Sequence, residues 1–441
     1  MPEPFDAGVI EALARRFQEP AWMTALRRAA LARHGVLPWP HKSDDVWRRT
    51  DVTLLDPARG FSPVEPALLQ SVAMPGRQWA SLVQPLGGEQ LVVRVNGSWL
   101  TSERPAGLTV QDLAEAAAAE PEPLRTILES DGLTDAEQKL SSLNAAFHHD
   151  DILVRVPAGY AGASPIRLVH LLSAGARQAL FPMTVIVVGA GSTVTLLDEY
   201  ASLDSAGSGE PHLVNARIEL ILEAGATVHY VRLQRWGAQA REFLLQRATL
   251  AEGASLTMAN LNLGASLSKA HLVTRLAGPD ASTRVYGFVF GRNRQHIDQH
   301  TLQDHLAPHT TSNLEFRAAL QDESRMIYTG LIRIASSAQQ TNAYQSNHNL
   351  LLSRTAHAET IPMLEILADD VQCKHGASTG PIDEEQAFYL MSRGLPRQAA
   401  ERLIVMGFVE SIIQQVPFEP LQIRLREEIE GELQGQGRGN A

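Results

Sequence analysis

The chain has 441 residues, and 38 lysine and arginine residues against 49 aspartate and glutamate residues give it a formal net charge of −11. Its 44% hydrophobic and 20% charged residues supply a core and argue against global disorder, and the acidic balance argues against a non-specific nucleic-acid binder. The one cysteine, Cys373, excludes an intramolecular disulfide and an all-thiolate metal site made by this chain alone.

The N-terminus and the hydropathy pattern predict a cytoplasmic protein. The first six residues are acidic and lack the basic segment and apolar stretch of a signal peptide. The most apolar window, 179–188, contains Pro182 and is shorter than the roughly 20 residues needed to span a bilayer. We therefore expect neither export nor membrane insertion.

Residues 1–150 form the first of three predicted regions, a helical N-terminal domain with short strands. Val9–Phe17 and Ala21–Arg33 have helical spacing, and Pro20 suits a helix start. Ala114–Glu120 reads as a further helix rich in alanine and glutamate. Tryptophan is concentrated in the first hundred residues, which is typical of packing in a small core. The residues concerned are Trp22, Trp39, Trp47, Trp79 and Trp99.

Residues 151–370 change to short apolar runs separated by small-residue turns, which predicts stacked β-coils. The turn glycines Gly191, Gly225 and Gly253 lie 34 and 28 residues apart. No helical pattern separates the runs, which counts against a βαβ fold, whereas a β-sandwich would give similar short strands. The runs are Ile152–Val156, Ile166–Leu172, Val185–Val188, Val194–Leu197, Ile218–Leu222 and Val228–Leu233.

Residues 371–441 form the third region, in which helical spacing begins at Pro381. Asp383 can cap a helix that ends at Gly394, and Pro396 can begin the next helix. That second helix carries an apolar stripe that includes Phe408. A charged amphipathic helix follows over 421–433.

Cys373 and His375 are the first candidate for site chemistry. On a strand, residues i and i+2 point to one face roughly 7 Å apart, so the two side chains could address a common partner. Thiolate and imidazole both bind iron or zinc, but two ligands cannot complete a four-coordinate site. Spacing alone favours a buried thiol beside a partly exposed histidine, and the pair is too sparse for a cysteine hydrolase.

A histidine cluster is the second candidate. His296 and Asp298 match half of a two-histidine, one-carboxylate iron site, which would need a further distant histidine. A mononuclear iron(II) oxygenase is therefore the enzymatic alternative, against the interpretation that these histidines cap turns or line a polar face. No phosphate-binding P-loop pattern is present, so we do not expect ATP hydrolysis by this chain. The other histidines of the cluster are His300, His305 and His309.

The stretch from Leu364 to Gly394, with its Cys-Lys-His-Gly core, closely resembles the C-terminal signature of the SufB/SufD family of iron–sulfur cluster assembly proteins. SufB-type chains carry functional cysteines of their own and an acidic residue at the position of Gly376, so the resemblance is to the SufD branch. Lys374 and Ser378 are small departures from the family pattern. Other segments agree in order along the chain: Glu19–Trp22, Trp47–Asp51, Leu143–Phe147 and Thr341–Leu352.

The resemblance implies a mainly β fold, with a right-handed parallel β-helix core between N-terminal and C-terminal helical domains. It implies a non-catalytic scaffold that pairs with a SufB-like subunit, binds the SufC ATPase and could also form a homodimer, with no nucleic-acid or membrane partner. His375 would be the metal ligand, with Cys373 a weaker candidate. No cofactor would be held stably by the isolated chain, since transient iron or an Fe–S cluster would be shared with SufB.

The resemblance also places SufC docking on the C-terminal helices. A carbohydrate-binding or lyase β-helix is a third hypothesis, against which the missing secretion signal and the helical C-terminal segment weigh. The candidate docking residues are Asp383, Phe388, Tyr389, Arg393 and Phe408.

Overall fold

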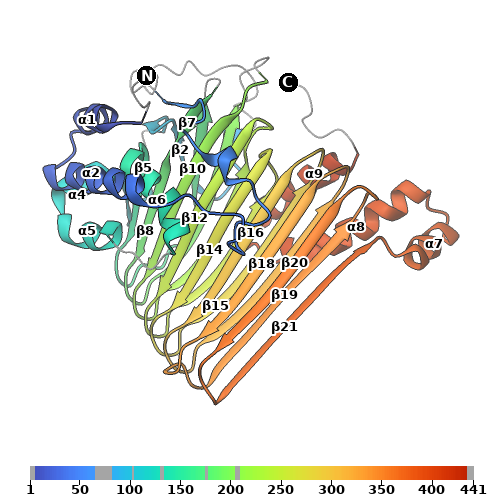
Figure 1. The fold of residues 1–441 in the computed structure, drawn as a ribbon. Coiled ribbons are helices and arrows are strands. Elements are labelled where there is room, and N and C mark those ends of the chain that lie inside the picture. The colour runs from blue at the N-terminus through green and yellow to red at the C-terminus, as the bar shows by residue number, and fades with distance from the viewer. Residues whose placement is uncertain are drawn as a thin grey trace.

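The computed structural model describes residues 5–64, 82–101, 104–129, 134–173, 177–203 and 209–434. Its centre is a parallel β-helix in which the chain alternates between two long sheets (Figure 1). Trp79 lies outside the described residues. Because neighbouring coil strands are parallel, the β-sandwich alternative is wrong and the predicted β-helix core flanked by helices is confirmed.

The first sheet contains one strand of each coil and ends at β20 (His357–Ile366). Its first strand, β4, pairs antiparallel with β5, and the later neighbours are parallel. Two short strands, β1 (Ser62–Pro63) and β7 (Gln178–Leu180), pair beside β10. In spatial order the strands are β4 (Thr109–Asp112), β5 (Asp150–Val156), β8 (Pro182–Val188), β10 (His212–Leu222), β12 (Ala240–Leu250), β14 (Leu267–Leu276), β16 (His296–His305), β18 (Arg325–Ile334) and β20 (His357–Ile366).

The second sheet contains the other strand of each coil. It begins with an antiparallel hairpin and continues with parallel strands. In spatial order the strands are β3 (Ser98–Trp99), β2 (Gln90–Val95), β6 (Ile166–Ser173), β9 (Thr193–Leu203), β11 (Thr227–Arg235), β13 (Ser255–Asn262), β15 (Ser282–Gly291), β17 (Thr311–Leu320), β19 (Thr341–Leu351) and β21 (Val371–Pro381). Strand structure thus continues past residue 370, and the domain boundaries stay a prediction.

The repeated turns have a backbone reason for their glycines. Gly191, Gly225 and Gly253 have φ angles of 65°, 67° and 63°, in the left-handed region where a side chain is strained. Each turn reverses the chain so that aliphatic residues of both sheets stack in one buried interior core. The core therefore follows from the strand alternation together with turns placed at a nearly constant spacing.

The N-terminal helices cover the outer face of the first sheet. Phe147 and Leu143 of α6 pack with Phe243 and Leu245 of β12 in one buried cluster. The helices predicted from periodicity are present, whereas α5 and α6 were not predicted from it. The elements are α1 (Ala7–Arg16), α2 (Ala21–Val36), η1 (Val52–Leu55), α4 (Leu113–Ala119), α5 (Pro121–Glu129) and α6 (Asp135–Phe147).

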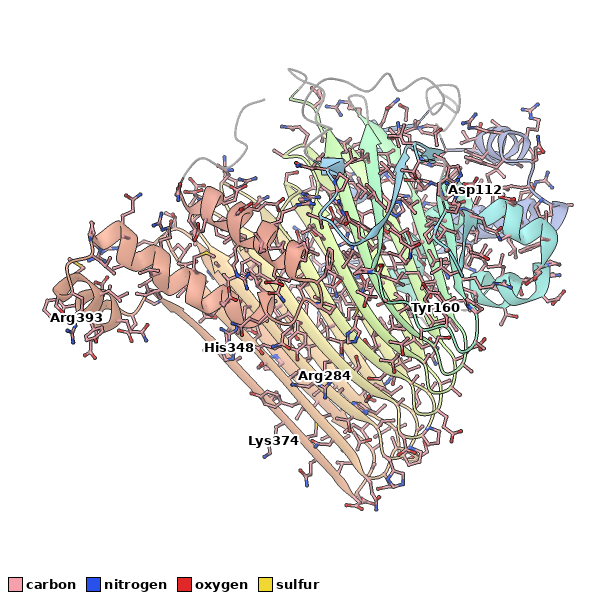
Figure 2. The ribbon with its side chains drawn as sticks, turned by 180° about the vertical axis from the view of Figure 1, so that it is seen from behind. Asp112, Tyr160, Arg284, His348, Lys374 and Arg393 are labelled. Atoms are coloured by element: carbon pink, nitrogen blue, oxygen red, sulfur yellow. The ribbon has the colours of Figure 1, made fainter. Side chains whose placement is uncertain are left out.

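The last two C-terminal helices cover the outer face of the second sheet, opposite the N-terminal helices, and the first of the three projects beyond the sheet (Figures 1 and 2). Asp383 caps α7 as predicted, because its carboxylate accepts hydrogen bonds from the Glu385 and Gln386 amides at 2.8 and 3.3 Å. Gly394 follows α7 with a φ of 93°, and Pro396 precedes α8. These helices are α7 (Glu384–Ser392), α8 (Arg397–Ile413) and α9 (Glu419–Leu433). Among the described helices, none is both long and apolar enough to cross a membrane.

Candidate functional site

The C-terminal end of the β-helix is open. Strand β20 pairs with β18 and strand β21 pairs with β19, and within the described residues neither has a second neighbour in its sheet. Both strands thus present a row of backbone donors and acceptors along one edge. An unpaired strand edge is a template for adding another strand.

Apolar side chains are exposed at this end because no described strand lies beyond β20 and β21. Leu364 and Ile366 stand in register beside Ile332 and Ile334, both fully buried in the preceding coil. Their own exposed fractions are 38% and 40%, and Leu367 in the following turn reaches 62%. Inward-facing leucine and isoleucine at such exposure leave an apolar surface at this end of the β-helix.

Cys373 and His375 lie on β21, on the same face, as the spacing predicted. Their neighbours on β19 are Ala343 and Gln345, so both side chains continue the inward-facing columns of the second sheet. Cys373 is half-buried and packs on a cluster that includes Ile332 and Ala343, and burial raises the pKa of its thiol. His375 is exposed, so it is the more accessible side chain of the two.

Polar side chains stiffen the strands around this pair. The side-chain oxygen Oδ1 of Asn347 accepts hydrogen bonds from the Thr360 hydroxyl at 2.7 Å and from the side-chain amide of Asn349 at 2.8 Å. The Asn349 amide also donates to the Thr379 hydroxyl at 3.1 Å, which ties β19 to β21. The network links both sheets of the last coil, so the open end is held in one arrangement.

The histidine–aspartate candidate is bound into an internal ion pair. Asp298 is buried, and its carboxylate accepts hydrogen bonds from the Lys269 ammonium at 2.8 Å and the Thr50 hydroxyl at 2.5 Å. Burial alone would raise the pKa of Asp298, but the Lys269 charge and these hydrogen bonds lower it. His296 Nε2 lies 3.0 Å from the same Thr50 hydroxyl. The carboxylate charge is therefore already compensated, which removes the geometric support for an iron oxygenase here.

The other three histidines of that cluster have roles within the fold: one is hydrogen-bonded, one is buried and one lies in a turn. The two ring nitrogens of His305 lie 2.7 and 2.8 Å from the hydroxyls of Thr310 and Ser312. Burial lowers the pKa of His300 to about 3, and His309 adopts a left-handed turn conformation with a φ of 61°. Among the described residues, no group of three histidine, cysteine or carboxylate side chains is arranged to hold a metal ion.

The candidate docking residues fall into two groups. Phe388 and Tyr389 on α7 are 72% and 57% exposed, and the Arg393 guanidinium lies 5.3 Å from the centre of the Tyr389 ring. Asp383 and Phe408 instead line a groove of about 480 Å³ between α7, α8 and β19. The other residues of the groove are Leu350, Pro381, Gln386, Leu403, Ile404 and Gly407.

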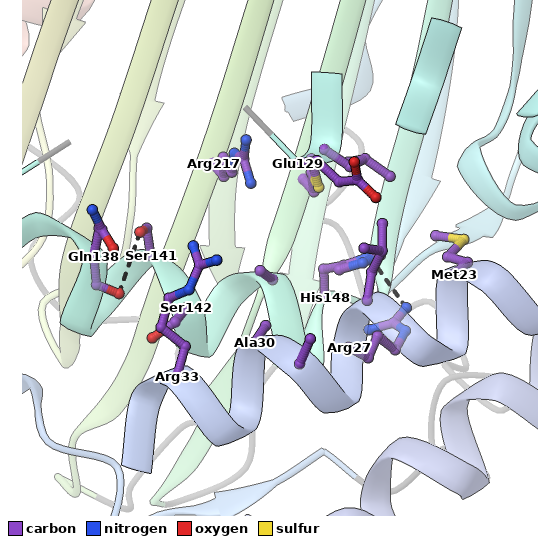
Figure 3. A pocket seen from close by; sticks show the side chains of 15 residues that line it. Met23, Arg27, Ala30, Arg33, Glu129, Gln138, Ser141, Ser142, His148 and Arg217 are labelled. Atoms are coloured by element: carbon purple, nitrogen blue, oxygen red, sulfur yellow. Dashed lines mark hydrogen bonds between the residues drawn. The ribbon is translucent and has the colours of Figure 1, made fainter. Parts of the chain in front are cut away.

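A second hollow lies between α2, α6 and the first sheet (Figure 3). Its volume is about 120 Å³, and Arg27, His148 and Arg217 contribute to its wall. The Arg27 guanidinium is paired with Glu19 at 2.5 Å, and that of Arg217 with Glu219 at 2.8 Å. The sequence interpretation missed this hollow, because its wall combines segments more than a hundred residues apart.

The comparisons with known proteins agree with this architecture. The family model for the SufBD core domain of the SUF system of FeS cluster assembly matches residues 170–408. An iron–sulfur cluster assembly SufBD family protein of Synechocystis is 28% identical over 413 residues, which cover 91% of this chain and 89% of that protein. The iron–sulfur cluster assembly protein SufD of Escherichia coli is 28% identical over 288 residues, with 65% and 67% covered.

SufB of Bacillus subtilis, also an iron–sulfur cluster assembly protein, is 25% identical over 300 residues, covering 68% of this chain and 63% of that protein. Similarity therefore extends to both named branches, and the matched core domain spans the coils from β6 through the open end into α8. The chain belongs to the SufBD family of iron–sulfur cluster assembly proteins.

Proposed function

We propose that this chain is the SufD-type scaffold subunit of a Suf assembly machine, and that it pairs through its open β-helix end with a SufB-like subunit. The observation that carries the proposal is the juxtaposition of unpaired strand edges, exposed inward-facing Leu364 and Ile366, and an accessible His375 on β21. A partner that continues both sheets would satisfy the edges and cover the apolar side chains together.

The energetics of this end suit a stable interface. Full burial of an aliphatic side chain contributes roughly 1.5–3 kcal/mol, and covering the exposed 38%, 40% and 62% of Leu364, Ile366 and Leu367 contributes the corresponding part of it, against which the entropy cost of association must be set. Backbone hydrogen bonds along two edges fix the register of the partner, as in strand addition. The pairing would therefore bring groups of the partner to a defined position beside His375.

His375 acts in this proposal as a labile ligand for iron or a nascent cluster, which is the cargo of the machine. The chain offers one thiol and one accessible imidazole here, so the remaining ligands must come from the partner. An imidazole binds borderline-soft metals and releases them on protonation, which suits transient holding. Cys373 is the weaker ligand, because its raised pKa keeps the thiol protonated at neutral pH.

The C-terminal helices would provide the docking surface for the SufC ATPase. Phe388 and Tyr389 form an exposed aromatic pair on α7, and the groove beside Phe408 lies next to them. Helix α7 begins three residues after β21 ends at Pro381. A displacement of the docked ATPase would thus be transmitted directly to the strand that carries His375.

The test is co-expression with the SufB-like and SufC-like chains of the same cell. We expect a stable complex, and we expect His375→Ala to retain the complex but to lose most of the cluster formed on it, measured by visible absorption and iron content. Cys373→Ser is the matched control and should retain most assembly. Failure to form a complex, or normal assembly by His375→Ala, would overturn the proposal.

A second copy of this chain is the competing occupant of the same end. We expect any homodimer, measured by light scattering on the isolated chain, to dissociate when the SufB-like subunit is added. A homodimer that persists beside a bound SufB-like subunit would contradict a shared surface.

A further inference from the structure

One row of outward-facing residues crosses the first sheet from its middle to its open edge. The residues lie side by side in register on six neighbouring strands, and they alternate along each strand with residues of the interior core. The first five are each at most 1% exposed, so other parts of the chain cover this outer face. From β10 to β20 the row consists of Asn215, Phe243, Lys269, Asp298, Ile327 and Glu359.

Residues 46–50 form a strap that lies along this row. Figure 1 shows the segment after α2 crossing over the first sheet. The amides of Trp47 and Arg48 donate hydrogen bonds to the Asp44 carbonyl at 2.8 and 2.9 Å, which keeps the segment in a compact turn. The buried Trp47 ring stacks on the Phe243 ring of β12, with the ring centres 6.0 Å apart. The strap is thus fixed at its start to a central strand of the sheet.

The next two members of the row bind the strap through hydrogen bonds. The Lys269 ammonium on β14 donates to the Val46 carbonyl at 2.7 Å. The Asp298 carboxylate on β16 accepts from the Thr50 hydroxyl at 2.5 Å. The buried Lys269–Asp298 pair, which carries the His-x-Asp pattern of the sequence, therefore anchors the strap.

The last member of the row, Glu359, joins the strap to the edge strand β20. Its Oε2 accepts a hydrogen bond from Arg49 Nε at 2.5 Å, and its Oε1 accepts one from Arg325 Nη2 of β18 at 2.6 Å. The hydrogen bond from Arg49 is the largest cause that lowers the pKa of the Glu359 carboxyl to about 2, so the carboxylate is charged at neutral pH. The side chains of Arg49 and Glu359 are 23% and 29% exposed, which shields their ion pair from much of the solvent.

We propose that the strap holds β20 in place for a pairing partner, with Arg49 as the positioning residue that binds the edge strand through Glu359. The strap is anchored on β12, β14 and β16, each of which has a strand on both sides, whereas β20 has one neighbour among the described strands. The inference rests on the proposed function for the identity of the partner, a SufB-like subunit. It assigns Arg49 no contact with that partner.

The physical reason lies in the behaviour of an edge strand. A strand that is hydrogen-bonded on one side opens locally at a lower free energy than a strand within the sheet. A partner can pair only with the ordered edge, so the time that the edge spends open weakens the apparent affinity. Because Glu359 faces the outer side of the sheet, the ion pair with Arg49 restrains β20 and leaves its backbone edge free for the partner.

The experiment measures hydrogen exchange and partner binding of Arg49→Met, which removes the guanidinium and keeps an unbranched stem. On the full-length chain, we expect amide exchange in peptides covering 357–366 to become about fivefold faster, with the unfolding midpoint within error of wild type. Binding of the SufB-like subunit, measured by titration calorimetry, should weaken about fivefold.

Two further variants identify the route of this effect. Glu359→Gln removes the charge from the other side of the ion pair, so adding Arg49→Met to it should cause no further loss of binding in a double-mutant cycle. Arg48→Met is the matched control, because Arg48 is the adjacent arginine and its guanidinium pairs with Asp45 at 2.6 Å. It should change neither the exchange of β20 nor the binding.

Three results would overturn the inference. The first is unchanged exchange of β20 in Arg49→Met. The second is wild-type affinity despite faster exchange, since the hold on β20 would then not serve the partner. The third is a loss of affinity that persists in full in the Glu359→Gln background, which would indicate that Arg49 contacts the partner directly.

The two proposals fail separately, because exchange is measured on the isolated chain. If the SufB-like subunit bound neither wild type nor any variant, the proposed function would be overturned, and faster exchange in Arg49→Met would still support the hold of the strap on β20. Binding by wild type, with unchanged exchange in Arg49→Met, would support the proposed function and overturn the role of the strap.

Discussion

The two ends of the β-helix are finished in opposite ways. At the N-terminal end, β4 and the β2–β3 hairpin close both sheets with antiparallel strands, and α4 and α5 pack over Leu153 and Met183. At the C-terminal end the parallel strands simply stop, and inward-facing Leu364 and Ile366 are exposed. Within the described residues, antiparallel strands therefore close the N-terminal end of the β-helix, and none closes the end that carries His375.

Because of this difference, the capped end should contribute to the folding stability of the chain and the open end to its binding of a second molecule. Apolar residues at the capped end contribute to folding of the isolated chain, because their partners are in the same molecule. Apolar residues at the open end can contribute their full burial only when a second molecule is present. Substitutions at the two ends should consequently affect different measurements.

The largest expected effect is on folding, at the capped end. Leu153 is fully buried between β5 and the α4–α5 cover, so Leu153→Ala should lower the free energy of unfolding by about 3 kcal/mol. Leu364→Ala at the open end should lower it by less than about 1 kcal/mol. Urea unfolding of both variants measures the contrast, and equal losses would show that the open end is as much a folding core as the capped end.

The next effect is a pH dependence at the capped end. His170 is buried on β6, with the carboxylates of Asp198 and Asp150 at 3.1 and 3.8 Å from its two ring nitrogens. Burial alone would lower the pKa of His170, but the nearby carboxylates of Asp150 and Asp198 raise it to about 9. Arg94, 3.4 Å from Asp150, belongs to the same cluster.

A folded-state pKa above the unfolded value means that the folded state retains the proton longer. The stabilisation is fully present below about pH 6.5 and is lost as the pH rises to about 9, by on the order of 3 kcal/mol. His170→Gln should flatten the unfolding free energy over this window, as measured by urea unfolding at a series of pH values. A variant with the wild-type slope would show that the imidazolium is not what the two carboxylates stabilise.

His305 near the open end provides the control of opposite sign. Burial lowers the pKa of His305 to about 4, so the folded state keeps this ring neutral between about pH 4 and 6.5. Its cost to stability grows as the pH falls through this window and is absent above it. His305→Gln should thus change the acid side of the profile and leave the alkaline side that depends on His170 unchanged.

A smaller effect is expected on partner binding at the open end. Leu364→Lys places a charge on the surface that the partner would cover, and should weaken binding of the SufB-like subunit at least tenfold, about 1.4 kcal/mol. Val36→Lys is the matched control, because Val36 is 83% exposed on α2 and lies outside this end. Titration calorimetry measures both, and equal binding by the two variants would contradict an interface at β20 and β21.

The sequence predicted the parts of this comparison that depend on local order. Turn glycines at a nearly constant spacing predicted the coils, and Asp383 predicted the start of α7. Helix α6 was missed although Thr134 and Glu137 form a capping box, a signal that is visible in the sequence. The placement of Cys373 and His375 on one strand face followed from their spacing alone.

The open end could not be predicted from local patterns. Leu364 and Ile366 have the alternation of an ordinary buried strand, and their exposure depends on there being no later coil beside them. The Lys269–Asp298 pair joins residues of adjacent coils, so sequence spacing showed the His-x-Asp pattern but not the ammonium that neutralises it.

The smallest expected effect concerns the aromatic pair on α7. Phe388→Ala removes an exposed side chain that makes little contribution to folding, so the unfolding midpoint should stay within error of wild type. Binding of the SufC-like ATPase, measured by titration against the SufB-paired chain, should weaken severalfold, because exposed aromatics at an interface centre carry much of its energy. Ile423→Ala, at a 48% exposed position on α9, is the control and should bind normally.

A loss of binding confined to Phe388→Ala would indicate two separate binding surfaces in this half of the molecule. The strand edges would bind the β-helix partner and α7 would bind the ATPase, and the short link from β21 to Glu384 would join the two surfaces. Equal binding by both variants would instead move the ATPase contact away from α7 and leave that link without a mechanical role.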